Sequence, residues 1–150
     1  MSQRAAVAMT EDEISSLIGE QRKLQLGTIN ADGTPHLVTM FYGMVDDKIA
    51  FWTYRSSQKI RNMERDPRVT LLVESGVEYF ELRGALIYGT ATMLTNQNDV
   101  RYVGSQVLRR MMEVEDDAAI AELVEATAAK RYAIVVEPVR VASWDHSKLT

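Results

Sequence analysis

The chain contains no cysteine and only two histidines, His36 and His146, among its 150 residues. The absence of cysteine excludes disulfide bonds, thiolate zinc sites, cysteine nucleophiles and thiol redox chemistry. Two histidines cannot build a histidine-rich metal site, so we expect no bound metal. A chain without thiols also fits a reducing compartment, and we therefore expect a cytoplasmic protein.

The chain also lacks a strong excess of charge and a long apolar run. Its formal net charge is −4, so we expect no nucleic-acid partner. No apolar run approaches the ~20 residues that span a bilayer, and the N-terminus has no apolar core of the kind found in a signal peptide. We therefore expect no membrane partner, a flexible tail over residues 1–9 and a single domain over residues 10–150.

The apolar periodicity predicts a β-rich α+β protein. A capping box at Thr10 and Glu13 predicts a first helix over residues 11–21. Alternating and β-branched runs predict strands at residues 24–28, 37–44, 49–53, 69–74 and 79–94, and a final strand at 132–143. A helical period over residues 96–130 predicts an insert of two helices that separate near residues 113–117.

The connections between these elements indicate an antiparallel sheet. Residues 30–33 and 45–48 read as tight turns, and there is neither a βαβ series nor a glycine-rich dinucleotide fingerprint. Gly84 and Gly89 predict bends within one long strand, and Pro138 predicts a bend in the last strand. These features favour an antiparallel split β-barrel of about six strands, Greek-key in type, with peripheral helices.

Residues 54–67, with the sequence YRSSQKIRNMERDP, carry the clearest chemical signal. They predict a short basic helix that begins near Gln58, capped by Ser56 or Ser57. The free N–H groups of a helix N-terminus favour an anion, and Lys59 in the first turn is unfavourable for the helix dipole unless an anion lies nearby. A phosphate site and an ordinary serine-capped helix with a solvated basic face both remain open at this point.

The motifs FWT at residues 51–53, SQK at 57–59 and NMERDPRV at 62–69 resemble the pyridoxamine 5′-phosphate oxidase-like superfamily of split β-barrel flavoproteins. Together with SWDH at residues 143–146, they look most like its actinobacterial branch that depends on the deazaflavin coenzyme F-420. The resemblance implies a homodimer with two equivalent cofactor sites at the subunit interface.

The resemblance also implies which residues bind the cofactor. Positions that match the family's phosphate-binding residues are Thr53, Ser57, Gln58 and Lys59. Val38 and Thr39 match the segment beside the flavin or deazaflavin ring, and Trp52 matches a position that lines the site. The flavin-dependent oxidase has an arginine where this chain has Gln58, so Arg55 or Arg61 would have to compensate.

The expected function is an oxidoreductase that uses reduced coenzyme F-420 as the hydride donor to a small organic acceptor with an activated double bond. The cofactor carries the hydride, so no acid–base pair is required and no catalytic residue is assigned. One alternative is an FMN-dependent oxidase or reductase of the same fold. Others are a protein that stores or carries a flavin or haem without turnover, and a cofactor-free dimer.

Overall fold

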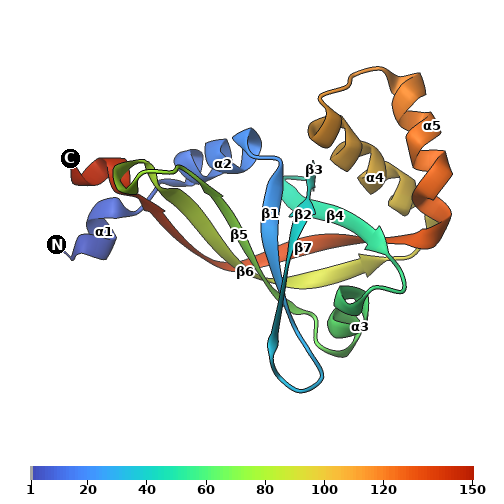
Figure 1. The fold of residues 1–150 in the computed structure, drawn as a ribbon, viewed down its shortest axis with the longest axis horizontal. Coiled ribbons are helices and arrows are strands. Elements are labelled where there is room, and N and C mark those ends of the chain that lie inside the picture. The colour runs from blue at the N-terminus through green and yellow to red at the C-terminus, as the bar shows by residue number, and fades with distance from the viewer. Residues whose placement is uncertain (1) are drawn as a thin grey trace.

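The computed structural model describes residues 2–150, and Met1 of the expected tail lies outside the described residues. Seven strands form one antiparallel sheet in the order β2-β1-β5-β6-β7-β4-β3, which curls into a split barrel (Figure 1). The strands are β1 Lys23–Ile29, β2 Pro35–Phe41, β3 Gly43–Val45, β4 Lys48–Tyr54, β5 Arg68–Ser75, β6 Arg83–Leu94 and β7 Arg131–Asp145. The predicted split β-barrel is confirmed.

Residues 2–150 also form five α-helices and three 3₁₀ helices. The α-helices are α1 Gln3–Val7, α2 Glu11–Glu20, α3 Gln58–Arg65, α4 Gln97–Met112 and α5 Asp117–Thr127. The 3₁₀ helices are η1 Tyr79–Glu81, η2 Ala128–Lys130 and η3 His146–Leu149. No described helix combines the length and the apolar character needed to cross a membrane.

The N-terminal region matches the expectation for α2 and differs from it in the tail. Thr10 and Glu13 form the predicted capping box, with the Thr10 hydroxyl accepting the Glu13 N–H at 3.2 Å. Residues 3–7 of the expected tail form helix α1, where Val7 is buried. The segment just after α1 is attached to β7, because the Met9 N–H donates to Ser143 Oγ at 3.0 Å.

The strand predicted over residues 37–44 is two strands with a break at Tyr42. This side chain is fully buried, and its hydroxyl donates to the backbone oxygen of Ile18 at 2.5 Å. The same burial raises the pKa of Tyr42 to about 12. Anchoring this side chain beneath α2 redirects the chain from β2 at one end of the strand order to β3 at the other, which brings the two edges of the barrel together.

The long hairpin of β6 and β7 contains the predicted bend. Tyr88 pairs with Arg140 and Gly89 pairs with Pro138, so Val139 is the extra residue of a β-bulge. A Cβ on Gly89 would lie 2.7 Å from the Glu137 backbone oxygen, which explains why this position holds a glycine. The bulge lets β7 bend between its first residues, which pair with β4, and its C-terminal half.

The molecule has two hydrophobic clusters, one on each side of β4. Phe51 and Ile49 face the barrel interior, whereas Trp52 and Ala50 face α4 and α5. Gly104 of α4 permits this second contact, because a Cβ there would lie 2.3 Å from the Trp52 ring. The predicted helical insert therefore packs on the outside of the barrel, directly over the strand that leads into α3 (Figure 1).

Candidate functional site

Helix α3 begins where β4 ends, as the sequence predicts. The N–H of Ser57 donates to the Tyr54 oxygen at 3.0 Å, which closes the turn between them. Ser57 occupies the N-cap position with extended backbone angles, but its side chain makes no capping bond. The predicted serine cap is therefore absent at Ser57, whose buried hydroxyl oxygen has no hydrogen-bond partner. Such an atom is costly in a folded protein unless water or a ligand supplies a partner.

Lys59 lies in the first turn of α3 and is partly withdrawn from water. Burial, and secondly the positive charge of Arg131, lower the pKa of Lys59 below its ordinary value. Within residues 2–150, neither cation forms a salt bridge with a carboxylate. A helix N-terminus with one lysine in its first turn and a second cation nearby, neither paired with a carboxylate, favours an anion.

Arg131, the first residue of β7, is the site residue that the sequence analysis missed. It pairs with Tyr54 across the sheet, and its guanidinium carbon lies 4.3 Å from the centre of the Tyr54 ring and 4.7 Å from that of Trp52. These contacts hold the cation by cation–π attraction. Its Nε is buried without a hydrogen-bond partner, so the fixed guanidinium still has a donor to offer.

Gln58 has a structural contact in addition to its predicted position near the anion site. Its Nε2 donates to Asn62 Oδ1 at 2.9 Å. Asn62 is fully buried, and its Nδ2 donates to Thr28 Oγ1 at 3.0 Å and to Asn30 Oδ1 at 2.9 Å. This network fastens α3 to β1, and Gln58 supports it.

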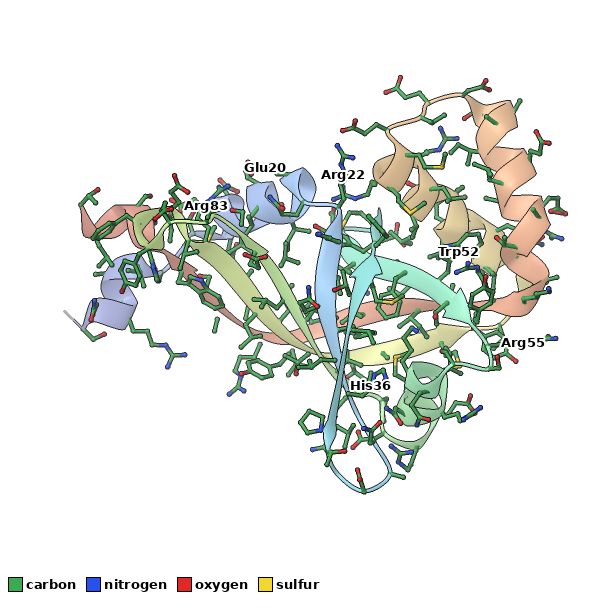
Figure 2. All side chains as sticks on the ribbon, in the orientation of Figure 1. Glu20, Arg22, His36, Trp52, Arg55 and Arg83 are labelled. Atoms are coloured by element: carbon green, nitrogen blue, oxygen red, sulfur yellow. The ribbon has the colours of Figure 1, made fainter. Side chains whose placement is uncertain are left out.

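The arginines expected to compensate for Gln58 are placed differently from Arg131. Arg61 donates to the Ser56 backbone oxygen at 3.1 Å, which stabilises the turn before α3. Arg55 has an exposed side chain, and its backbone N–H donates to the Lys130 oxygen at 3.0 Å (Figure 2). The nearby cation that shares the environment of Lys59 is therefore Arg131, which comes from a distant part of the chain.

The remaining predicted residues lie on β2 and β4 and point in different directions. Val38 packs toward the barrel core, whereas Thr39 is exposed and donates to Gln25 Oε1 at 3.0 Å. Thr53 is buried near the start of α3, and Trp52 extends from β4 toward α4 (Figure 2). Thr39 and Trp52 meet at one pocket, which Arg131 also lines.

His36 of β2 is a further polar group on this side of the barrel. It pairs with Thr28, so both side chains lie on the sheet face that α3 covers. Its Nδ1 is buried without a partner. The unpartnered groups beside α3 thus come from three separate strands and loops, which no local motif could reveal.

The electrostatics of the site suit an anionic cofactor. Ser57 Oγ is unpartnered and Lys59 is a partly desolvated cation at the same helix N-terminus, so a phosphate could accept from both. No group of three or more metal-binding side chains occurs among residues 2–150. The residues present therefore fit the phosphate of a flavin or deazaflavin, with the ring-binding role of β2 following from the resemblance alone.

Solved structures similar to this chain include proteins of several kinds. The conserved hypothetical protein Rv2991 from Mycobacterium tuberculosis has 36% sequence identity and a TM-score of 0.91, covering 99% of this chain and 92% of its own. An F-420 reductase has 21% identity and a TM-score of 0.69, covering 88% and 98%. HutZ, the heme storage protein from Vibrio cholerae, has 18% identity and a TM-score of 0.66, covering 87% and 92%. The last two share the fold.

A comparison with curated protein sequences gives no match. The family model described as pyridoxamine 5′-phosphate oxidase matches residues 10–145, which include the whole barrel and both helices of the insert. The chain therefore belongs to the pyridoxamine 5′-phosphate oxidase family.

Proposed function

We propose that this protein is an oxidoreductase that uses reduced coenzyme F-420 as the hydride donor to a small organic acceptor with an activated double bond. The observation that carries the proposal is the set of unpartnered groups at the start of α3. Ser57 Oγ and Lys59 together offer a hydroxyl and a cation to one anion, with the second cation, Arg131, near Lys59. The fold shared with an F-420 reductase supports this choice of cofactor.

The charge of the site bears on which cofactor binds. A phosphodiester, as in coenzyme F-420, carries one negative charge, whereas the terminal phosphate of FMN carries close to two at neutral pH. The arginine of the flavin-dependent oxidase is replaced by Gln58, whose amide donates to Asn62. This replacement favours the cofactor whose phosphate group is less charged.

FMN is the second candidate, and Arg131 is the observation that favours it. This cation comes from β7 and lies near enough to Lys59 to lower its pKa, so it can add the charge that Gln58 lacks. Lys59 and Arg131 would then together balance the FMN phosphate. Storage of a flavin without turnover would use the same groups, so turnover requires its own measurement.

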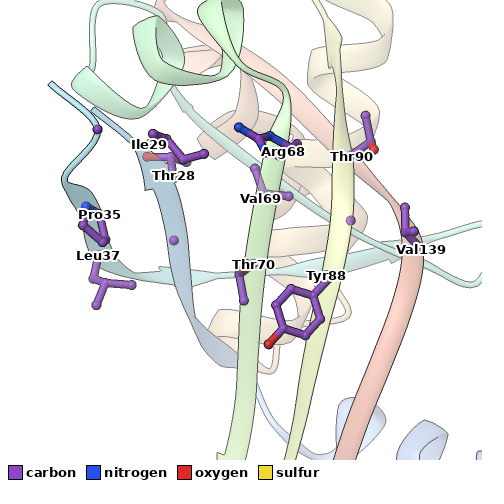
Figure 3. Close-up of a pocket in the computed structure, with 13 residues that line it drawn as sticks. Thr28, Ile29, Pro35, Leu37, Arg68, Val69, Thr70, Tyr88, Thr90 and Val139 are labelled. Carbon is purple, nitrogen blue, oxygen red and sulfur yellow. The ribbon is translucent and has the colours of Figure 1, made fainter. Parts of the chain in front are cut away.

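A homodimer is part of the proposal, and the outer face of the sheet supports it. A groove of about 460 Å³ runs across β1, β5 and β6, with Thr70, Tyr88 and the exposed Leu37 and Val139 at its margins (Figure 3). Leu37 of the edge strand β2 is 70% exposed and Val139 at the β7 bulge is 73% exposed, so this face carries two apolar side chains without cover. We propose that a second copy of the chain covers this face.

Two titrations test the cofactor. Purified protein is mixed with coenzyme F-420 and, separately, with FMN, and each dissociation constant is measured by fluorescence. We expect F-420 to bind more tightly, and Lys59→Gln to weaken that binding about tenfold or more, because a charge-assisted hydrogen bond is lost.

The matched control is Lys130→Gln, which removes an exposed lysine directly before Arg131 and should leave the affinity unchanged. Micromolar binding of FMN with no binding of F-420 would overturn the choice of deazaflavin. Oxidation of bound reduced F-420 by enones or quinones, followed by stopped-flow absorbance, separates an enzyme from a carrier.

A further inference from the structure

A pocket of about 330 Å³ lies where the end of β2 approaches β4, α4 and α5. This volume is within the range of small-molecule sites. Its lining residues share an apolar character, apart from two threonines and one cation, and include Met40, Phe41, Trp52, Val107, Leu108 and Met111. Such walls favour an apolar molecule, because burying its surface there is favourable and both threonines already have hydrogen-bond partners in the protein.

The one charged residue that lines the pocket is Arg131. Its guanidinium is fixed against the Trp52 and Tyr54 rings at 4.7 and 4.3 Å. A cation held in one orientation loses little entropy when it binds a planar carboxylate. Its side chain forms no salt bridge within residues 2–150, so a carboxylate in the pocket would supply its counter-ion.

The charge balance with the neighbouring cofactor site leaves Arg131 available. Lys59 and Arg131 supply two positive charges, whereas the phosphodiester of coenzyme F-420 supplies one negative charge. Lys59 belongs to the helix N-terminus, where the phosphodiester is expected, and Arg131 lines the pocket. One cation thus remains for a second anion on the pocket side.

We propose that this pocket binds an apolar molecule that ends in a carboxylate, with the carboxylate on Arg131 and the apolar body between β2 and helices α4 and α5. That this molecule is the hydride acceptor rests on the proposed function, whereas the binding site itself does not. The acceptor class is then an unsaturated, apolar carboxylic acid. Its size is limited by the volume of about 330 Å³.

Binding of a carboxylate that has no double bond to reduce tests the site without any cofactor. Octanoate and octanamide differ in charge and share the apolar body, and calorimetry gives the affinity of each for the cofactor-free protein. Trp52 lies in the pocket and Trp144 is the other indole of the chain. In the Trp144→Phe protein, octanoate should therefore change the remaining indole fluorescence.

We expect octanoate to bind roughly tenfold or more tightly than octanamide, because only the carboxylate forms a charged hydrogen bond. Arg131→Met should remove this preference and keep the apolar part of the affinity, and Arg131→Lys should restore part of it. Both variants must show the wild-type circular dichroism spectrum, which excludes misfolding as the cause of any change in affinity. Equal affinity for the acid and the amide in the wild-type protein would overturn the proposal.

Filling the pocket provides an independent test. Leu123 is 40% exposed and lines the pocket, so Leu123→Trp should fold and block octanoate. Met112 is 45% exposed and lies outside the pocket lining, so Met112→Trp is the matched control and should leave binding unchanged. Octanoate binding that survives Leu123→Trp would place the ligand elsewhere.

The same titration in saturating coenzyme F-420 separates this inference from the proposed function. Simultaneous binding of octanoate and F-420 is expected, since the phosphate and the carboxylate use different cations. Competition between them would assign the pocket to the cofactor's own acidic tail and overturn the inference while leaving the proposed function intact. Failure of F-420 to bind, with octanoate still bound, would contradict the proposed function alone.

Discussion

The two ends of the barrel differ in whether their polar side chains have hydrogen-bond partners within the protein. At the end formed by α1, η1 and η3, His146 Nδ1 lies 2.9 Å from the Tyr79 oxygen, and their rings stack at 4.6 Å. Lys148 donates to the Ala8 oxygen at 3.0 Å and to Glu13 Oε2 at 2.7 Å. The lysine there thus joins the two ends of the chain, and the histidine joins the C-terminal end to η1.

The end that contains α3 leaves comparable groups incomplete. Ser57 Oγ, His36 Nδ1 and Arg131 Nε are buried without partners, and Lys59 faces another cation. A fold rarely keeps such groups in one region unless something else satisfies them. The polar atoms that the protein leaves unpaired therefore distinguish a candidate binding site from a polar cluster that only supports the fold.

The exception at the α3 end is Asn62, which is fully satisfied and structural. Asn62→Ala should lower the free energy of unfolding by about 3 kcal/mol, because it leaves Thr28, Asn30 and Gln58 without their buried partner. Chemical denaturation measures this change. Asn98→Ala, at an exposed position of α4, is the control and should change stability little. Equal changes in the free energy of unfolding for the two substitutions would show that the Asn62 network does not hold α3 against β1.

The packing of α4 on β4 gives the second prediction. Gly104→Ala should destabilise the protein by about 2 kcal/mol, since its Cβ would lie 2.3 Å from the Trp52 ring. It should also weaken octanoate binding, because Trp52 holds Arg131. Gly19→Ala, in the exposed part of α2 with no atom within 4 Å of its Cβ, should instead be neutral or slightly stabilising. Denaturation and Trp fluorescence of both variants check this contrast.

Much of the fold follows from local patterns, whereas the complete site does not. The apolar strand, the serines and Pro67 predict where α3 begins and ends, and the helical period at residues 96–130 predicts α4 and α5. Arg131 has no local motif. Its position depends on the pairing of β4 with β7, which only long-range packing determines.

The break at Tyr42 was missed for a related reason. Residues 37–44 alternate like one strand, and only the hydrogen bond of the Tyr42 hydroxyl to α2 shows why the chain turns there. The structural role of Gln58 was not predicted, because its partner Asn62 is fixed by hydrogen bonds to Thr28 of β1 and to Asn30 in the following loop. In each case the deciding contact joins segments far apart in the chain.

The pH dependence of cofactor binding gives the third prediction. Burial and Arg131 lower the pKa of Lys59, so the free protein loses this charge at a lower pH than an ordinary lysine would. The affinity for coenzyme F-420 should therefore fall as the pH rises toward the ordinary lysine value of about 10.5, by roughly tenfold. The stability of the cofactor-free protein should rise over the same interval, because deprotonation relieves the buried charge.

Fluorescence titrations of coenzyme F-420 across this pH range test the effect, with Lys59→Gln as the reference. That variant should show weaker binding with a flatter pH profile. A wild-type profile that matches the variant's would mean that Lys59 does not contact the cofactor.

The smallest expected effect concerns Ser57. Ser57→Ala should raise the free energy of unfolding by up to about 1 kcal/mol, because it removes a buried hydroxyl that has no partner. It should weaken F-420 binding several-fold, since that hydroxyl would meet the phosphate. Thermal unfolding and titration of Ser57→Ala beside Ser56→Ala, an exposed neighbour, measure both effects. A lower free energy of unfolding in Ser57→Ala would show that this serine is an ordinary helix cap.

The titration of Lys59 itself tests most directly the claim that the α3 end is an anion site. Heteronuclear NMR of the lysine side chains gives the pKa of Lys59 with and without saturating coenzyme F-420. The account predicts a pKa below the ordinary value in the free protein that rises on binding, while that of Lys48, raised by its pairing with Glu137, stays unchanged. A Lys59 pKa that does not move when F-420 binds would contradict the account.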